Sequence, residues 1–562
     1  GLRLTATVIE AESGAVTGEM EAQGANVIEA TSELVTLLRP LLAPDISDQA
    51  AGFTSIPLAE ATTPSNEALE AFVAGLNARY LDRDQQSARA HLEQALVVDP
   101  AFALAAAQLH DLLRLTGDLG AAVEMADRAL VHEYKLDNTT RFSLKANRHA
   151  LTGDYDTAMR VLRMWTEVHP SNFVAWMSLA QNQVVIGEFD AAIESLRRAE
   201  ALDPDNDAIL KRRAAIDQLT GDYEAAAERL SDLIEREPDD VGARIDLGQS
   251  LARAGRSEAA LEVFQEAELL ADDPLRVRLS QANVWIREGE FDKADRTLDA
   301  LLAASSDPAR RAQIVTMRLP LLAAAGRYRA LLATLDEHQE LMQQVMAPAQ
   351  YWSMWAEFQW TAHSGVGDFD AAAAAIEVAQ DALGEPFNRI LALNWIRHLV
   401  ETGGSPSDLE PHLEQLRFFE TSFSYGAIIG VVRWGEALAR GHAGATGEAV
   451  ELMREARDRY RASGLGLNMS AIEGLEHELA RLMIADGQRR AAGELVDHIL
   501  ERHPSMAEAR WTRIELALEE DDEASARADL VALLAQWENA DEDLVRLNEA
   551  EALLDRLGAP AD

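Results

Sequence analysis

Residues 176–204 read WMSLAQNQVVIGEFDAAIESLRRAEALDP, and this stretch decides the fold. Apolar residues recur in it at intervals of three and four on both sides of a glycine, which is the spacing of one helix face. Gly187 indicates the end of a first helix, because glycine adopts the left-handed conformation needed there most easily. Pro204 indicates the start of the next helix, where its missing N–H costs little. The stretch therefore predicts two helices joined by a tight turn.

The same pattern returns at a fixed interval along the chain. Five glycines recur at intervals of 34 residues, and so do three prolines. This period resembles that of the tetratricopeptide repeat, a helix–turn–helix unit that stacks into a solenoid. The resemblance implies an all-α superhelical solenoid of about a dozen units, preceded by a small N-terminal α/β hairpin and helix. The residues that carry the period are Gly153, Gly187, Gly221, Gly255 and Gly289, and Pro170, Pro204 and Pro238.

Local pattern divides the chain into five expected segments. Residues 2–10 and 15–23 alternate as strands do, and residues 25–42 have helical spacing. A lone hairpin with one helix is too small to be stable, so we expect it to belong to a larger domain or to dock on the first repeat. The expected segments are an α/β remnant at 1–43, a proline-containing linker at 44–64, a repeat array at 65–340, an irregular helical junction at 341–430 and C-terminal repeats at 431–562.

The composition argues against several classes of function. With 51 basic and 95 acidic residues the net charge is −44, which repels nucleic-acid backbones and anionic membranes. The absence of cysteine removes disulfides, thiolate metal sites and cysteine nucleophiles. No apolar run approaches the length of a membrane span. Phosphate-binding, hydrolase, zinc-protease and EF-hand motifs are also absent, so we expect no catalytic residue, metal site or cofactor.

The resemblance also implies which residues line the inner face of the array, namely those of the first helix in each pair. Asn and Gln there could hydrogen-bond an extended peptide, while apolar residues receive its side chains. The alternative is an ordinary solvated groove. Lys211 is the only basic residue at these positions in the periodic repeats, which disfavours a receptor for C-terminal carboxylates. The candidate residues for binding a protein or peptide are Ser143, Asn147, Met177, Gln181, Val184, Lys211, Gln218, Gln249 and Asn283.

Aromatic residues gather at the start of the expected junction. Tyr351, Trp352 and Trp355 form a candidate binding hot spot, because exposed aromatic clusters dominate many interfaces. The favoured interpretation is that they fill the core, where aromatic residues are commonly found.

The order of the parts resembles a narrower group of proteins. Residues 4–24, LTATVIEAESGAVTGEMEAQG, precede a helix, a linker and the repeats that begin SNEALEAFVAGLNARY at Ser65. This arrangement resembles the TolB-N-terminal-like domain and repeats that follow the anchor of bacterial membrane-anchored Ser/Thr protein kinases. It implies an excised sensor region whose kinase module and anchor lie upstream. No kinase motif is present in this chain, so no catalytic residue is carried over.

The leading expectation is a non-catalytic interaction scaffold or sensor that binds a peptide or protein as part of a bacterial signalling protein. One alternative is a structural assembly factor of an envelope or secretion complex. Another is a small-molecule sensor with a pocket in residues 341–430. The expected location is periplasmic or extracytoplasmic, with which the absence of cysteine agrees, and the cytoplasm is the alternative. The sequence leaves the partner and the oligomeric state open.

Overall fold

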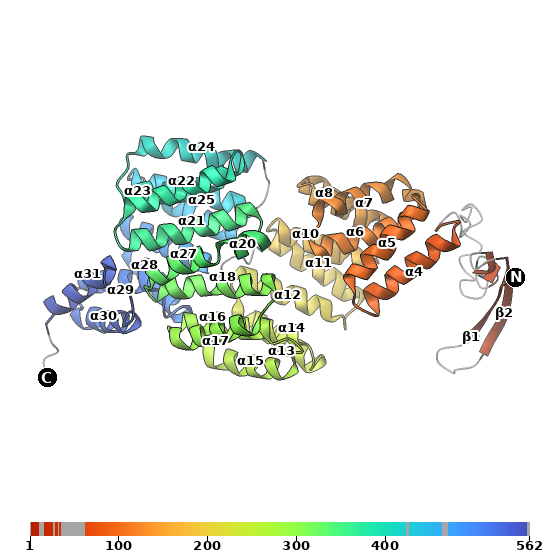
Figure 1. The fold of residues 1–562 in the computed structure, drawn as a ribbon, viewed down its shortest axis with the longest axis horizontal. Helices are drawn as coiled ribbons and strands as arrows, with labels where there is room; N and C mark the ends of the chain where they lie inside the picture. The colour runs from red at the N-terminus through yellow and green to blue at the C-terminus, as the bar shows by residue number, and fades with distance from the viewer. Residues whose placement is uncertain are drawn as a thin grey trace. The chain divides into compact units, whose positions relative to one another are not determined.

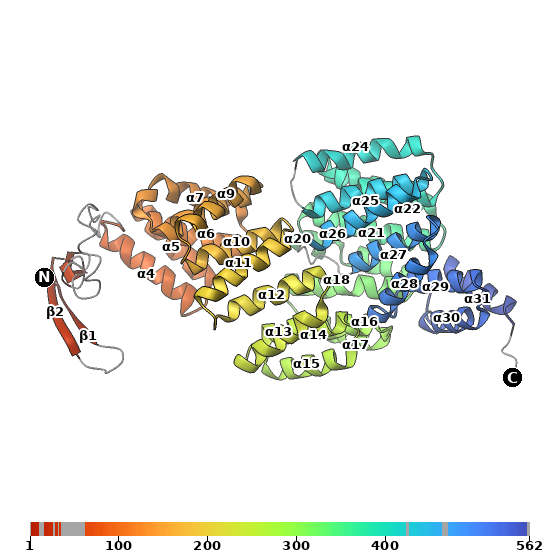
Figure 2. The same ribbon diagram turned by 180° about the vertical axis from the view of Figure 1, so that it is seen from behind.

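The computed structural model describes residues 2–9, 16–25, 29–31, 33–34, 37, 62–422, 426–462 and 470–558. The chain forms two compact units, unit 1 (residues 1–182) and unit 2 (residues 183–562), which are drawn in Figure 1 and from behind in Figure 2. The boundary between them falls within one helix, α10 (Phe173–Val185). Each unit contains buried apolar clusters of its own.

Unit 1 begins with the predicted hairpin. Strand β1 (Leu2–Ile9) pairs antiparallel with β2 (Val16–Gly24), with Leu2 opposite Gly24. The predicted helix at 25–42 and the predicted linker at 44–64 lie largely outside the described residues. The helices that follow are α4 (Asn66–Tyr80), α5 (Gln85–Val98), α6 (Ala103–Thr116), α7 (Leu119–Val131), the 3₁₀ turn η1 (Glu133–Lys135), α8 (Asn138–Leu151) and α9 (Tyr155–Val168).

Unit 2 continues the series of antiparallel helix pairs. None of the helices that the structure describes is both long enough and apolar enough to span a bilayer. The first pairs are α11 (Phe189–Leu202), α12 (Asp207–Thr220), α13 (Tyr223–Arg236), α14 (Val241–Arg253), α15 (Ser257–Leu270), α16 (Leu275–Arg287), α17 (Phe291–Ala304), α18 (Pro308–Ala324), α19 (Tyr328–Glu337) and α20 (Gln339–Val345).

Helices continue through the second half of unit 2, including the expected junction at 341–430. They are α21 (Pro348–Gly365), α22 (Phe369–Leu383), η2 (Phe387–Leu391), α23 (Ala392–Glu401), α24 (Pro406–Ser422), α25 (Gly426–His442), α26 (Thr446–Ala462), α27 (Ser470–Ala485), α28 (Arg489–Arg502), α29 (Ala507–Glu519), α30 (Glu523–Gln536) and α31 (Val545–Arg556).

A glycine ends the first helix of these pairs, and in some pairs an aspartate caps the second helix. The five predicted turn glycines have φ between +77° and +86°, a region in which a side chain would be strained. The residue after Gly221 is Asp222, whose side chain accepts a hydrogen bond of 3.1 Å from the N–H of Ala225. This bond satisfies one of the free N–H groups at the start of α13. The helix–turn–helix unit predicted from the sequence is therefore confirmed.

Small residues let the two helices of a pair approach closely. In α11, Ala192 and Ala199 are fully buried. In α14, a methyl group on Gly248 would lie 2.5 Å from Cε1 of the buried Phe264 ring. Repetition of this packing builds the predicted all-α solenoid, and that fold class is confirmed.

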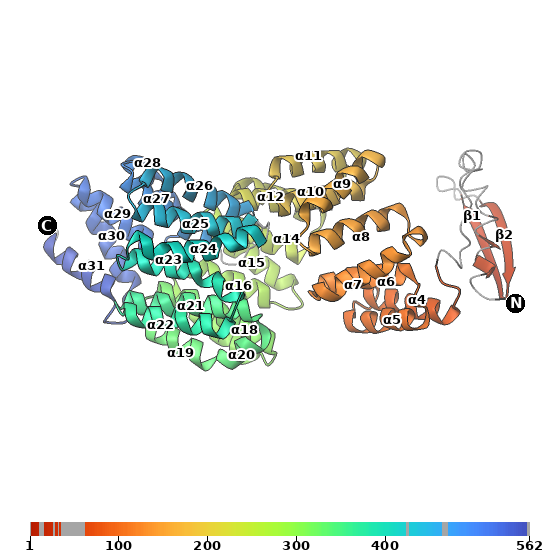
Figure 3. The ribbon, with the colours of Figure 1, turned by 90° about the horizontal axis from the view of Figure 1, so that it is seen from above.

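The last helices of the chain return to the turn ends of earlier repeats within unit 2 (Figure 3). The Ser505 N–H donates to the Arg287 carbonyl at 2.9 Å, and its hydroxyl donates to the Ile286 carbonyl at 2.7 Å. The Asp541 N–H donates to the Gly326 carbonyl at 3.0 Å. The α28–α29 and α30–α31 connections thus donate to carbonyls at the ends of α16 and α18, where the last carbonyls of a helix lack helical partners. The Ile286 carbonyl also accepts from the Gly289 N–H at 3.1 Å.

Buried ion pairs lie in the same contact. Arg287 is 4% exposed and places Nη1 3.1 Å from Oε1 of Glu473, which is 5% exposed. Glu476 is 1% exposed and pairs with Arg461 and Arg502. Burial alone would raise the pKa of Glu473, but the positive charges of Arg287 and Arg502, together with a backbone hydrogen bond, hold that pKa below its usual value. The carboxylate is therefore ionised at neutral pH inside the contact.

Candidate functional site

Three of the predicted groove residues connect successive first helices in unit 2. Gln218 on α12 donates through Nε2 to Oγ of Ser250 on α14 at 2.8 Å. Gln249 on α14 donates to Oγ of Ser280 on α16 at 3.2 Å. Asn283 on α16 lies 3.9 Å from the sulfur of Met317 on α18. We call the surface formed by α12, α14 and α16 the first-helix face. These amides link neighbouring repeats, so part of their hydrogen-bonding capacity is already used.

Lys211 also contacts the next repeat. Its ammonium group lies 2.7 Å from Asp240 and 3.2 Å from Glu237, both just before or at the start of the following repeat. Hydrogen bonds to Asp240 and Glu237 raise the pKa of Lys211, with the larger effect from Asp240. This lysine is exposed, so the ion pairs are worth little to stability. Asp240 and Glu237 nevertheless compensate the positive charge of Lys211 within the chain.

Two other charged residues on the first-helix face differ from Lys211, because their charges are not paired with a neighbouring repeat. Arg212 on α12 and Asp246 on α14 are half-buried and stand 34 residues apart, at the same position of successive repeats. Across the part of the chain that the structure describes, neither side chain forms a hydrogen bond or an ion pair. Burial lowers the pKa of Arg212. Burial also raises the pKa of Asp246, and the nearby Arg276 only partly opposes this. The face therefore carries two desolvated groups of opposite sign.

The remaining predicted groove residues lie on α8 and α10. Ser143 and Asn147 on α8 belong to unit 1 and are half-buried. On α10, Met177 and Gln181 are half-buried, whereas Val184 is only 8% exposed. The low exposure of Val184 leaves little of its side chain available to a partner.

The candidate aromatic hot spot lies on α21. Tyr351 is 1% exposed, and burial raises its pKa to about 12. Trp352 is half-buried and packs edge-on against the Tyr351 ring at 5.0 Å and against the ring of Trp355 at 5.4 Å. The structure thus places Tyr351 in the core, with parts of Trp352 and Trp355 accessible.

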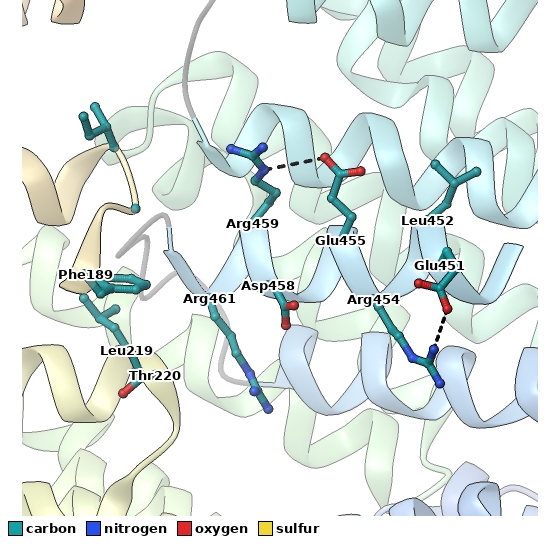
Figure 4. Close-up of a pocket in the computed structure, with 12 residues that line it drawn as sticks. Phe189, Leu219, Thr220, Glu451, Leu452, Arg454, Glu455, Asp458, Arg459 and Arg461 are labelled. Carbon is teal, nitrogen blue, oxygen red and sulfur yellow. Dashed lines mark hydrogen bonds and ion pairs between the residues drawn. The ribbon is translucent and has the colours of Figure 1, made fainter. Parts of the chain in front are cut away.

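A cavity of about 810 Å³ lies in unit 2 between α26 and the turn ends of two earlier repeats. Figure 4 shows Phe189, Leu219 and Thr220 on one side of it and charged side chains of α26 on the other. The charged residues pair with one another: Arg454 contacts Glu451 at 2.5 Å, and Arg459 lies 3.6 Å from Glu455. The walls are therefore apolar on one side and charged but compensated on the other.

Comparison with known proteins agrees with this architecture. Residues 144–207 and 220–274 match the family described as Tetratricopeptide repeat. These two segments resemble tetratricopeptide repeats. Arrays of such repeats mediate protein–protein interactions through extended surfaces. No curated protein gave a significant sequence match.

Several solved structures match this chain at low sequence identity. A tetratricopeptide repeat protein from Parabacteroides merdae is 13% identical, covers 45% of this chain and 99% of its own, and gives a TM-score of 0.35. The APC/C hetero-tetramer Cut9–Hcn1 is 13% identical over 88% of this chain and 97% of its own, with a TM-score of 0.31. YrrB, described as a TPR protein with an unusual peptide-binding site, is 18% identical to this chain. The match covers 33% of this chain and 95% of YrrB, with a TM-score of 0.24.

The candidate groove residues were selected by counting back from each turn glycine. This rule misses Arg212 and Asp246 by a single residue in each repeat. It selects positions ten, six and three before the glycine, whereas both charged residues lie nine before it. A charge at the same position of two successive repeats is a signal visible in the sequence. The cavity has no comparable signal, because its two walls come from parts of the chain more than 200 residues apart.

Proposed function

We propose that this chain is a non-catalytic scaffold that binds a peptide or protein on the first-helix face of unit 2. The observation that carries the proposal is the pair Arg212 and Asp246. The other polar residues of this face that were selected from the sequence are bonded to neighbouring repeats, but these two charges are not. They are the groups on which an incoming partner would act most strongly.

The physical reason is the cost of desolvation. A charge removed from water without a compensating group is unfavourable, and a partner that supplies the opposite charge or a hydrogen bond recovers that loss. Arg212 would receive a carboxylate or a backbone carbonyl, and Asp246 would receive an amine or an N–H group. Because the two residues occupy equivalent positions in successive repeats, an extended peptide can reach both.

The test begins with a peptide library displayed on phage and selected on the full chain. Binding of the selected peptides is then measured by fluorescence anisotropy with Arg212→Gln and Asp246→Asn. Loss of a hydrogen bond to a charged group should weaken binding by about 10- to 100-fold. The matched controls are Arg296→Gln on α17 and Glu262→Gln on α15, both exposed on second helices, and they should leave affinity unchanged.

Selected peptides that bind both variants as tightly as the wild-type chain would place the binding surface elsewhere. A loss of affinity in the two controls as well would show that the effect is not specific to Arg212 and Asp246, and would contradict the proposal. Far-ultraviolet circular dichroism of each variant separates loss of binding from loss of fold.

We further propose that the scaffold acts as the extracytoplasmic sensory region of a bacterial signalling protein of the Ser/Thr kinase type. The support is the order of hairpin, helix, linker and repeats in residues 1–130. Sequencing the gene upstream of the codon for Gly1 tests this proposal. A kinase-like module followed by a membrane span would support it, whereas a start codon or a signal peptide at that point would contradict it.

A further inference from the structure

The turn ends of the first helices offer the same hydrogen-bond acceptor in every repeat. Near each turn glycine, the carbonyl two residues earlier is left over when the helix ends. In α16 this is the Arg287 carbonyl, which accepts from the Ser505 N–H at 2.9 Å. In α18 it is the Ala324 carbonyl, which accepts from Gln536 Nε2 and Trp537 Nε1, each at 3.2 Å. The chain thus binds these acceptors with its own later segments.

The equivalent acceptor in α12 is the carbonyl of Leu219, two residues before Gly221. No described residue donates a hydrogen bond to it. Leu219 instead lines the 810 Å³ cavity, whose opposite wall is α26 (Figure 4). The guanidinium of Arg461 on α26 lies beside Gly221 at this turn end. The cavity therefore adjoins a turn-end acceptor that no described residue occupies, whereas the equivalent acceptors of α16 and α18 are occupied.

The segment that occupies the closed position shows what chemistry fits the open one. Ser505 lies in the α28–α29 connection, just before a helix, and supplies both an N–H and a hydroxyl donor. Met506 follows it and packs, partly buried, against the apolar cluster of the C-terminal helices α23–α29. At α12, Phe189 and Leu219 provide an apolar wall beside the unoccupied acceptor. A volume of about 810 Å³ lies within the usual range of ligand pockets.

We propose that this cavity is a second binding site, distinct from the first-helix face, for a turn-and-helix segment of a partner protein. The segment carries an N–H or hydroxyl donor for the Leu219 carbonyl and an apolar side chain for the wall formed with Phe189. The paired charges of α26 have no large excess of either sign, so the partner segment needs no strong net charge.

The probe is a fluorescein-labelled peptide of residues 499–510, ILERHPSMAEAR, which contains the turn that the chain binds at α16. Anisotropy with the full chain should show saturable binding. Leu219→Arg places a charge in the apolar wall and should weaken binding at least tenfold. The matched control is Leu269→Arg on α15, where the leucine is 88% exposed, and it should bind as the wild type does.

A second variant keeps the test decisive if Leu219→Arg fails to fold. Thr220 is exposed at the cavity wall, so Thr220→Trp fills the space without entering the core, and it should weaken binding to a similar extent. Arg212→Gln should leave this binding unchanged, which separates the site from the first-helix face. Absence of binding to the wild-type chain, or equal binding to Thr220→Trp, would overturn the proposal. The latter result would mean that the peptide displaces its own copy at α16.

Discussion

Replacing Arg287 by methionine should loosen the contact between the C-terminal helices and the earlier repeats of unit 2. Methionine resembles the aliphatic part of the arginine side chain but carries no charge, so Glu473, which is 5% exposed, would lose its main counter-charge. The carboxylate must then stay ionised at a high cost or take up a proton. Removal of one partner from a buried ion pair costs about 3–5 kcal/mol. We expect an effect of this size on the local opening of α27 and α28.

Native-state hydrogen exchange measures this opening helix by helix, which suits a repeat protein in which stability varies along the chain. The opening constants of α27 and α28 should rise by about 100-fold or more in Arg287→Met. Arg287→Met combined with Glu473→Leu should recover most of the loss, because an apolar pair carries no unpaired charge. The control is Arg490→Met, whose ion pair with Glu494 lies at the surface and should contribute little.

Two results would refute this reasoning. If Arg287→Met exchanged no faster than Arg490→Met, the buried pair would not hold the C-terminal helices in place. If the double variant opened as readily as Arg287→Met alone, the lost guanidinium contacts, and not the uncompensated carboxylate, would account for the effect.

Three further predictions follow from the packing and electrostatics of unit 2. Gly248→Ala should lower stability in urea by about 1–3 kcal/mol, because its methyl group would overlap the Phe264 ring; an increase would show that the ring moves freely. Asp222→Ala should cost about 1 kcal/mol in the same assay through the lost bond to the Ala225 N–H, whereas Asp222→Asn should retain most of it. Burial lowers the pKa of His503 to about 3, so the unfolded chain binds a proton there between pH 6.5 and 3 while the folded chain does not. Stability should therefore fall as the pH drops through that range, and His503→Gln should reduce the difference in melting temperature between pH 7 and pH 5.

The sequence by itself determined the 34-residue repeat and the residues that end and cap its helices. A turn glycine such as Gly187 must adopt a positive φ, and a capping residue such as Asp222 acts on an N–H three residues away. Both effects are local, so the 34-residue period carries them directly. The same period predicted the helix face on which Gln218 and Gln249 lie. It could not show that these amides bond to the next repeat, because that depends on how closely two helices stack.

Only the tertiary structure decided which turn ends are covered and which remain open. Ser505 contacts the Ile286 carbonyl across 219 residues of sequence, and Leu219 faces a cavity whose other wall is α26. These positions depend on the small rotation between successive repeats, which accumulates over many units before two distant helices meet. No single residue determines this accumulated rotation. The lack of a partner for Arg212 and Asp246 within the described chain is a property of the same assembled packing.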